Sequence, residues 1–368
     1  MSKRFISSIN YMRGICMLGV IAIHVGSVAL LNPTPNLALV GVLEILSRFS
    51  VPAFFFLSAF GMFYSQPLHE PFHYMAYLRR RLRTVFVPYV TWSLFYLAFT
   101  AVLSHNWQAF AVANLTKTFF YGLAMYHIYF LVILLWFYLL MPLWRRLLHL
   151  MEHGALLSFI ILFAANVLFN FYSSYIWTLN TDNPFLQDAF TYRLNYMVFH
   201  YLFIFMFGAY TAEHFEVVTA WLSRHSKLVI AFQLIASAAM LAAYCGVMTV
   251  LGYDALSAVF TVHQLSPCGM IYTVSTLLFL LWLWECRPVS PATHRIFSLL
   301  GNYSYPIYLV HPVFLSICTG FAARYGITLR AIYIIIIYCL VTAAASLWSV
   351  AISRLSLPRW LSICLQGK

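Results

Sequence analysis

The stretch Ile9-Asn-Tyr-Met-Arg-Gly-Ile-Cys-Met-Leu-Gly-Val-Ile-Ala-Ile-His-Val-Gly-Ser-Val-Ala-Leu-Leu31 decides the fold. It contains a single formal charge, Arg13, and a run of about 20 mostly apolar residues is long enough for a helix to cross a hydrocarbon core about 30 Å thick. Comparable runs recur to the end of the chain. Because lipid offers no partner for unpaired backbone groups, we expect these segments to be helices.

The composition agrees with a membrane location. The chain of 368 residues is 63% hydrophobic and 8% charged, whereas soluble domains are roughly half apolar and a quarter charged. A water-soluble fold is therefore excluded, and we predict an all-α, polytopic integral membrane protein with about ten transmembrane helices in a single domain, residues 1–368. The predicted spans are 9–31, 38–64, 84–104, 119–142, 155–172, 195–212, 226–251, 266–284, 302–320 and 331–353.

The positive charge predicts the orientation of the chain. The formal net charge of +12 is distributed over short loops and forms no continuous basic stripe, so we do not expect nucleic acid as a partner. With the N-terminus inside, sixteen basic residues, beginning with Lys3 and Arg4, fall on the cytoplasmic side, and only Lys117, Arg193, Arg324 and Arg330 fall outside. This asymmetry predicts that both termini are cytoplasmic and that the protein lies in a bacterial inner membrane.

The first predicted helix carries two ionisable side chains, Arg13 and His24. Eleven residues at about 100° per residue return to within roughly 20° of the same helix face, about 16 Å further along the axis. Arg13 alone is equally well explained as a basic anchor that snorkels to the interface. His24 has a structural alternative as a packed histidine, but ionisable groups inside membranes are costly and usually functional.

The second predicted helix contains Glu44 and Arg48, four residues apart. This spacing allows the two side chains to pair along one face, which lowers the cost of burying either charge. Both should lie near the depth of His24. A structural ion pair that holds the first two helices together and a role in catalysis are equally compatible with the pattern.

The densest cationic cluster is Arg79-Arg80-Arg81-Leu-Arg83, before the third predicted span. Guanidinium groups there could hold the phosphates of a cytosolic, nucleotide-bearing donor such as coenzyme A. The alternative is a topology signal or a contact with anionic lipid.

Three other histidines lie in apolar segments: His127 after Tyr126, His200, and His311 before Pro312. No pair of these has the i, i+4 spacing of a helical zinc site, so we predict no metal. The seven cysteines lack a C-x-x-C pair and are read as small buried residues.

Five motifs follow one another along the chain: Arg13 with His24, Ser50-Val-Pro-Ala-Phe-Phe-Phe-Leu-Ser58, Arg80 with Arg83, Tyr126-His-Ile-Tyr-Phe-Leu131, and Asn302-Tyr-Ser-Tyr-Pro-Ile-Tyr-Leu-Val-His311. Together they resemble the acyltransferase 3 family of membrane O-acyltransferases, over essentially the whole chain. The resemblance is strongest to its stand-alone branch, which includes the acetyltransferase of enterobacterial common antigen. The chain departs from the family at Asn10, where many members have an acid, and at Ala59, where Gly is common.

The resemblance implies transfer of an acyl group, acetyl first, from cytosolic acetyl-CoA or another acyl-CoA to a hydroxyl of an envelope glycan or lipid-linked sugar. His24 would be the general base, with a transient acyl-histidine as an open alternative. Arg80 and Arg83, with Arg13, would hold the donor phosphates. Glu44 or Arg48 would orient the imidazole or the acceptor, and the acceptor side would include Tyr126, His127 and His311.

Two other functions stay open at this stage. Buried His, Glu and Arg also mark the pathways of transporters and flippases, although no pair of broken helices in corresponding halves is visible. A sensor or assembly subunit without chemistry is the second alternative. The sequence leaves open the acyl group, the acceptor and whether the chain forms a homo-oligomer.

Overall fold

The computed structural model describes residues 5–368, so the basic residues Lys3 and Arg4 lie outside the described part. The chain is 80% helical, with no strand in residues 5–368. Eight helical segments are long and apolar enough to cross a membrane, and a ninth results if α7 and α8, which bend by 68°, form one span. The predicted all-α, polytopic membrane fold is confirmed. The eight segments are Ser7–Ala29, Leu37–Ser65, Tyr74–Ser104, Ala155–Ile176, Ser226–Leu251, Pro267–Cys286, Ser304–Arg324 and Ala331–Arg354.

Besides 38–64, whose interruption is described with the candidate site, two of the ten predicted spans are broken. The predicted span 119–142 is interrupted after Tyr121, because Gly122 has a φ of 69° and ends the helix in a left-handed cap. The predicted span 195–212 is divided into short pieces, and Met197 is extended between them, with φ −78° and ψ 104°. Apolar composition predicted continuous helices at both places, whereas the backbone turns there.

The internal contacts divide the chain into two compact units. Unit 1 comprises residues up to Pro67 and Ile204–Ile352, and unit 2 comprises Leu68–Phe203 and Ser353–Lys368. The elements of unit 1 are α1 Ser7–Ala29, α2 Leu37–Val40, the π-helix η1 Gly41–Ile45, α3 Ser50–Ser65, α12 Leu202–Glu213, which begins just before the unit boundary, α13 Phe215–Arg224, α14 Ser226–Leu251, α15 Ala255–Thr261, α16 Pro267–Cys286, α17 Pro291–Asn302, α18 Ser304–Arg324 and α19 Ala331–Arg354.

The elements of unit 2 are shorter on average. They are α4 Tyr74–Arg81, η2 Leu82–Phe86, α5 Val87–Ser104, η3 Gln108–Phe110, α6 Val112–Tyr121, α7 Tyr129–Leu139, α8 Met141–Glu152, α9 Ala155–Phe171, η4 Tyr172–Ile176, α10 Pro184–Thr191, α11 Arg193–Tyr196, η5 Val198–Tyr201 and α20 Arg359–Gln366. The organisation of residues 1–368 as a single domain stays a prediction.

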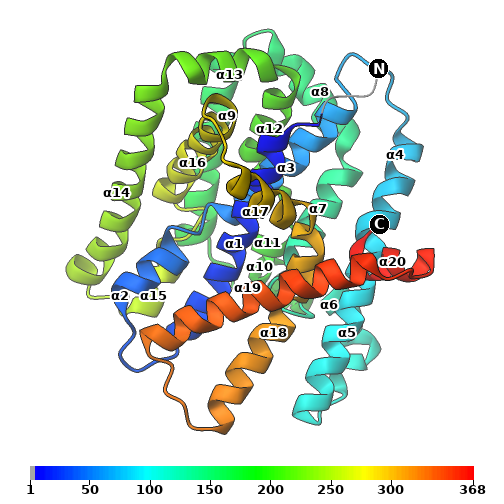
Figure 1. The fold of residues 1–368 in the computed structure, drawn as a ribbon, viewed down its shortest axis with the longest axis vertical. Coiled ribbons are helices and arrows are strands. Elements are labelled where there is room, and N and C mark those ends of the chain that lie inside the picture. The colour runs from blue at the N-terminus through cyan, green and yellow to red at the C-terminus, as the bar shows by residue number, and fades with distance from the viewer. Residues whose placement is uncertain (1–4) are drawn as a thin grey trace. The chain divides into compact units, whose positions relative to one another are not determined.

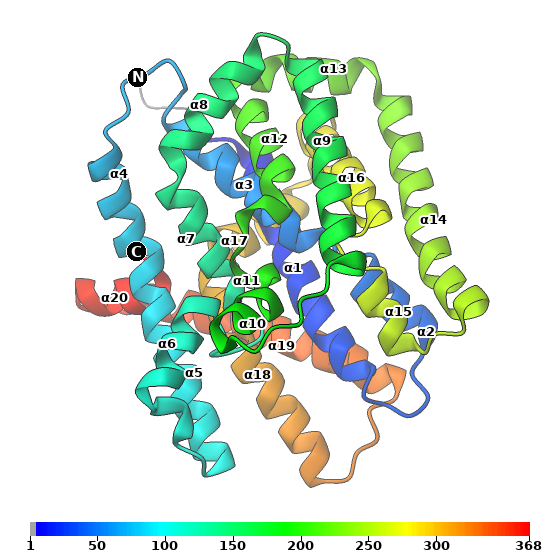
Figure 2. The ribbon, with the colours of Figure 1, turned by 180° about the vertical axis from the view of Figure 1, so that it is seen from behind.

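Helix α1 is the central element of unit 1. It contacts α3, α16, α17 and α18, and both ribbon views show it among these helices (Figures 1 and 2). The side-chain amide of Asn10 donates to the carbonyl of Ser298 at 3.3 Å and to Oδ1 of Asn302 at 3.0 Å, which attaches the start of α1 to α17. Met12 and Cys16 are fully buried. The helix that carries His24 is therefore surrounded by other helices of its unit.

In unit 2, the chain continues from α4 through η2 into α5, and α20 packs against α5 (Figure 1). The indole of Trp92 donates to the carbonyl of Leu365 at 3.4 Å, and the hydroxyl of Tyr74 donates to the carbonyl of Leu139 at 2.8 Å. These bonds give the indole N–H of Trp92 and the hydroxyl of Tyr74 a partner within the protein, as a lipid environment requires. They attach α20 and α7 to the segment that carries the arginine cluster.

Candidate active site

The imidazole of His24 stacks on that of His311. The ring centroids are 5.3 Å apart and the planes differ by 21°. His24 is half-buried, on α1, whereas His311 is fully buried, on α18. The sequence had placed His24 at the centre of the site and His311 only at its acceptor side, so the structure brings together two residues that were predicted separately.

The hydrogen bond of His311 follows from the proline that comes next. Pro312 lies inside α18 and has no N–H, so the carbonyl of Tyr308, four residues earlier, loses its usual helical partner. Nδ1 of His311 donates to this carbonyl at 2.7 Å. Because a carbonyl only accepts, the hydrogen must be on Nδ1, and in the neutral ring Nε2 is the basic nitrogen. Pro312 thus selects the tautomer of His311.

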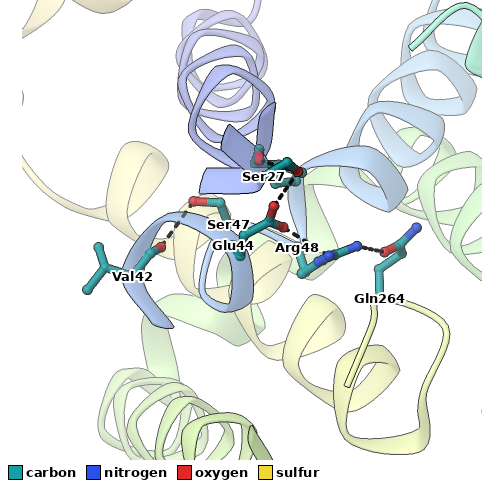
Figure 3. Close-up of polar contacts among 7 residues, drawn as sticks. Ser27, Val42, Glu44, Ser47, Arg48 and Gln264 are labelled. Atoms are coloured by element: carbon teal, nitrogen blue, oxygen red, sulfur yellow. Dashed lines mark hydrogen bonds and ion pairs between the residues drawn. The ribbon is translucent and has the colours of Figure 1, made fainter. Parts of the chain in front are cut away.

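Glu44 and Arg48 form the predicted ion pair. Nη2 of Arg48 lies 2.9 Å from Oε2 of Glu44, and the glutamate side chain is fully buried. Figure 3 shows the extended network: the hydroxyl of Ser27 on α1 donates to Oε1 of Glu44 at 2.5 Å, and Nη1 of Arg48 donates to Oε1 of Gln264 at 3.2 Å. Both carboxylate oxygens of Glu44 therefore accept a hydrogen bond, as a buried charge requires.

The helix around this pair is irregular. The amide of Leu46 donates to the carbonyl of Gly41 in a π-turn, and the amide of Arg48 donates to the carbonyl of Ile45, three residues earlier. The continuous helix predicted for 38–64 is consequently interrupted between Ile45 and Ser50. Such π-turns occur frequently at functional sites.

A glycine on α1 allows Glu44 to approach. A Cβ at Gly26 would lie 2.7 Å from Cγ of Glu44 and 3.2 Å from Cβ of Leu43, closer than side-chain atoms normally come. Only a residue without a side chain fits between α1 and η1 here. Gly26 therefore lets the carboxylate reach Ser27, its neighbour on α1.

Arg48 connects the ion pair to the histidines. Its guanidinium is close enough to interact electrostatically with both His24 and His263. His263 lies with Gln264 in the loop between α15 and α16, where burial, and secondly the charge of Arg48, lower its pKa to about 4. Within residues 5–368 the buried Nε–H of Arg48 has no hydrogen-bond partner. The site thus contains the neutral imidazole of His263 near the guanidinium of Arg48, whose Nε–H can still donate a hydrogen bond.

Arg13 lies further along α1, near its N-terminus. It is half-buried, and its Nη2 is 3.2 Å from the point that a Cβ at Gly61 of α3 would occupy. Eleven residues of helix separate it from His24 by about 16 Å, so the two side chains are not in contact. Arg13 and His24 therefore lie on the same helix, α1, but are separated along its axis.

Unit 2 carries the other predicted residues. Arg80 and Arg83 are exposed and make no ion pair within the described residues, whereas Arg81 packs over the rings of Tyr77 and Tyr138. The first two are available to an anionic ligand, and Arg81 is a packing residue.

The predicted acceptor-side residues Tyr126 and His127 lie in the turn before α7. The imidazole of His127 is buried, with its ring edge-on to Tyr96 at 5.4 Å, and Tyr126 is about half exposed. Within residues 5–368, no group of three or more His, Cys, Asp or Glu side chains is arranged to hold a metal ion.

Sequence reasoning missed four contributors: Ser27, His263, Gln264 and the tautomer-setting role of Pro312. Three of them meet Glu44 or Arg48 from other segments, and nothing in their local sequence marks them. The His311-Pro312 pair, in contrast, was visible as a signal, because a proline inside a helix always frees a carbonyl four residues earlier.

Comparison with known proteins decides the family. The family model for acyltransferase 3, described as an acyltransferase domain, matches residues 6–354. The chain belongs to the acyltransferase 3 family. It is a multi-pass membrane protein, and it spans less than two thirds of the length of the Staphylococcus aureus relative described below.

Two relatives are similar to this chain over most of its length. The “Putative membrane-bound acyltransferase YfiQ” of Bacillus subtilis is 25% identical over 326 residues, 85% of this chain and 82% of that protein. The “Probable poly-beta-1,6-N-acetyl-D-glucosamine export protein” of Staphylococcus aureus is 21% identical over 244 residues, 65% of this chain and 62% of that protein. No solved structure matches. The resemblance to the enterobacterial branch stays a prediction.

Proposed function

We propose that this acyltransferase moves an acetyl group from cytosolic acyl-coenzyme A to a hydroxyl of a cell-envelope glycan or lipid-linked sugar, at the bacterial inner membrane with both termini in the cytoplasm. The observation that carries the proposal is the stack of His24 on His311 beside Arg48, inside a domain of the acyltransferase 3 family. The name of the Staphylococcus aureus relative supports a glycan as the acceptor.

In the proposed reaction, His24 takes the proton of the acceptor hydroxyl while the hydroxyl oxygen attacks the thioester carbonyl. The carbon–sulfur bond breaks, an ester forms, and the thiolate of coenzyme A leaves and takes the proton back from the imidazolium. An N–H donor is needed for the oxyanion that develops on the carbonyl. The Nε–H of Arg48 is a suitable donor, because it is buried and has no partner within the described residues.

The stacked rings support this assignment to His24. Protonation of both imidazoles would place two positive charges about 5 Å apart in a poorly solvated site, so we expect at most one of the two rings to be an imidazolium at a time. His311 is already oriented by Tyr308 and is fully buried. Of the two rings only His24 is partly exposed, which favours it as the base.

Arg80 and Arg83 are proposed to bind the donor phosphates, because they are exposed and carry charges without ion-pair partners among the described residues. Arg13 is proposed as an additional cation for the donor. Guanidinium groups suit phosphates because they donate two parallel hydrogen bonds.

The test uses purified protein in liposomes, labelled acetyl-coenzyme A, and an uncharged β-1,6-linked N-acetylglucosamine oligosaccharide as the acceptor. We expect free thiol to appear together with labelled, base-labile ester on the sugar. A protein that releases no thiol but moves labelled sugar across the liposome membrane would contradict the proposal. That result would favour export, the function that the name of the Staphylococcus aureus relative states.

A further inference from the structure

A cavity of about 410 Å³ in unit 2 lies between the C-terminal half of α5, the turn that follows it, and α6. Both ribbon views show α6 beside the end of α5 (Figures 1 and 2). Its volume falls within the range of about 300–1,000 Å³ that is usual for small-molecule sites. The polar residues that line it are Thr100, Ser104, Asn106, Asn114, Lys117 and Thr118.

The one charged side chain of the cavity lining is paired with a residue outside the lining. Lys117 is the single charged residue of its lining, and Nζ of Lys117 lies 2.7 Å from Oδ1 of Asp188. This hydrogen bond raises the pKa of Lys117, so the ammonium group is charged at neutral pH and already has a partner. The cavity of about 570 Å³ near the start of α1 differs, since Glu213, Glu216 and Glu285 line it. A lining whose one charge is already paired favours an uncharged ligand in unit 2.

Each of the two asparagines in the lining uses one of its two side-chain amide atoms in a hydrogen bond within the protein. Oδ1 of Asn106 accepts from the amide of Gln108 at 3.0 Å, and Nδ2 of Asn114 donates to the carbonyl of Gln108 at 2.8 Å. The Asn106 amide nitrogen and the Asn114 carbonyl oxygen therefore keep free hydrogen-bonding capacity. Thr118 is buried, and its hydroxyl has no hydrogen-bond partner among residues 5–368. The cavity thus offers donors, acceptors and a hydroxyl together.

The backbone at the cavity is unusual. His105 directly follows α5 with a φ of 53°, the one positive φ of a residue other than glycine in residues 5–368. This left-handed conformation ends α5, a common helix ending in which the residue is usually glycine. Asn106, the next residue, lines the cavity. The C–H groups of a ring can pack against the apolar part of the lining, which consists of Leu97, Ala101, Ala109, Leu123 and Ala124.

The arginine cluster lies where α4 leads into α5, whereas the cavity lies at the opposite end of α5. Seventeen residues separate Arg83 from Thr100, which corresponds to about 26 Å along a helix and nearly the thickness of a hydrocarbon core. In the orientation proposed above, the arginines face the cytoplasm and the cavity faces the outside. An envelope glycan is accessible on that side.

We infer that this cavity binds an uncharged sugar unit of the acceptor, with ring hydroxyls and an acetamido group meeting Asn106, Asn114 and Thr118. Neutral sugars present many hydroxyl donors and acceptors without charge, which matches the lining, and an anionic sugar would find Lys117 already paired. The inference rests on the proposed function for its physiological meaning, but binding can be measured without acyl transfer.

The experiment measures the dissociation constant of the uncharged β-1,6-linked N-acetylglucosamine oligosaccharide with detergent-solubilised full-length protein and no acyl-coenzyme A. Thr118→Val keeps the shape of the side chain and removes the hydroxyl, and we expect the dissociation constant to rise about three- to tenfold. Thr116→Val is the matched control on the same helix, because its hydroxyl donates to the carbonyl of Val112 and does not line the cavity. It should bind like the wild type.

Asn114→Leu is the second variant, and thermal unfolding in detergent accompanies both. If Thr118→Val unfolds, Asn114→Leu decides the outcome. Wild-type protein that binds no oligosaccharide, or cavity variants that bind as tightly as the wild type, would overturn the inference. Sugar binding without acyl transfer would overturn the proposed function and leave this inference standing, whereas transfer without binding at this cavity would do the opposite.

Discussion

The ion pairs Glu44–Arg48 in unit 1 and Lys117–Asp188 in unit 2 have similar geometry and different surroundings. Their N–O distances are 2.9 and 2.7 Å, yet the Glu44 side chain is fully buried, whereas the side chains of Lys117 and Asp188 are 37% and 33% exposed. Burying a pair costs desolvation energy that only close partners offset, while an exposed pair contributes little. The comparison indicates that unit 1 retains a costly charge arrangement next to two histidines, as expected for an active site.

The largest expected effect comes from breaking the buried pair. Arg48→Met should destabilise the protein by about 3–5 kcal/mol, because it leaves the Glu44 carboxylate buried without its cation. Lys117→Met should change stability by about 1 kcal/mol or less. Unfolding in mixed micelles of increasing SDS content measures both. Adding Glu44→Gln to Arg48→Met should recover part of the loss, and equal stabilities of the two single variants would contradict the comparison.

A smaller effect is expected from disturbing the packing that buries the pair. Gly26→Ala places a methyl group 2.7 Å from Cγ of Glu44, so η1 must move, at a cost of about 1–3 kcal/mol. Gly246→Ala is the matched control, because a Cβ there meets nothing within 4 Å. The same SDS titration compares them. A Gly26→Ala protein with wild-type stability and activity would show that the close approach of α1 is dispensable.

The exposed cations of unit 2 should affect binding and not stability. Arg80→Gln and Arg83→Gln are each expected to raise the KM for acetyl-coenzyme A about five- to tenfold, near 1–1.4 kcal/mol, with kcat little changed. Arg81→Gln is the comparison, since its guanidinium packs on Tyr77 and Tyr138 and should affect folding instead. Steady-state kinetics at several salt concentrations provide the measurement. An unchanged KM would assign the cluster to topology.

The smallest effect concerns the tautomer of His311. Pro312→Ala restores an N–H four residues after Tyr308, which competes for the carbonyl that Nδ1 of His311 now uses. We expect kcat to fall severalfold, about 1 kcal/mol, and its pH profile to shift, while stability is kept or increased. A parallel loss of stability and activity would instead indicate that Pro312 is needed only for the shape of α18.

The sequence was sufficient for the fold class and for the local pair in the site. Long apolar runs specify membrane helices, and four-residue spacing predicted Glu44 with Arg48, which form their pair although the helix is interrupted between them. Gln264 and Ser27 could not be predicted, because each reaches the pair from a separate segment and neither has a distinctive neighbourhood. The interruptions at Gly122 and Met197 were also missed, since hydropathy does not report backbone conformation.

His24 is the residue on which the account depends. The direct test is the rate of acetyl transfer from labelled acetyl-coenzyme A to the oligosaccharide by the His24→Ala protein, with His225→Ala, whose Nδ1 donates to the carbonyl of Trp221, as the matched control. We predict a loss of about 10²–10⁴-fold for His24→Ala, with normal membrane insertion and unfolding, and wild-type rates for His225→Ala. Full activity of a properly folded His24→Ala protein would contradict the central claim.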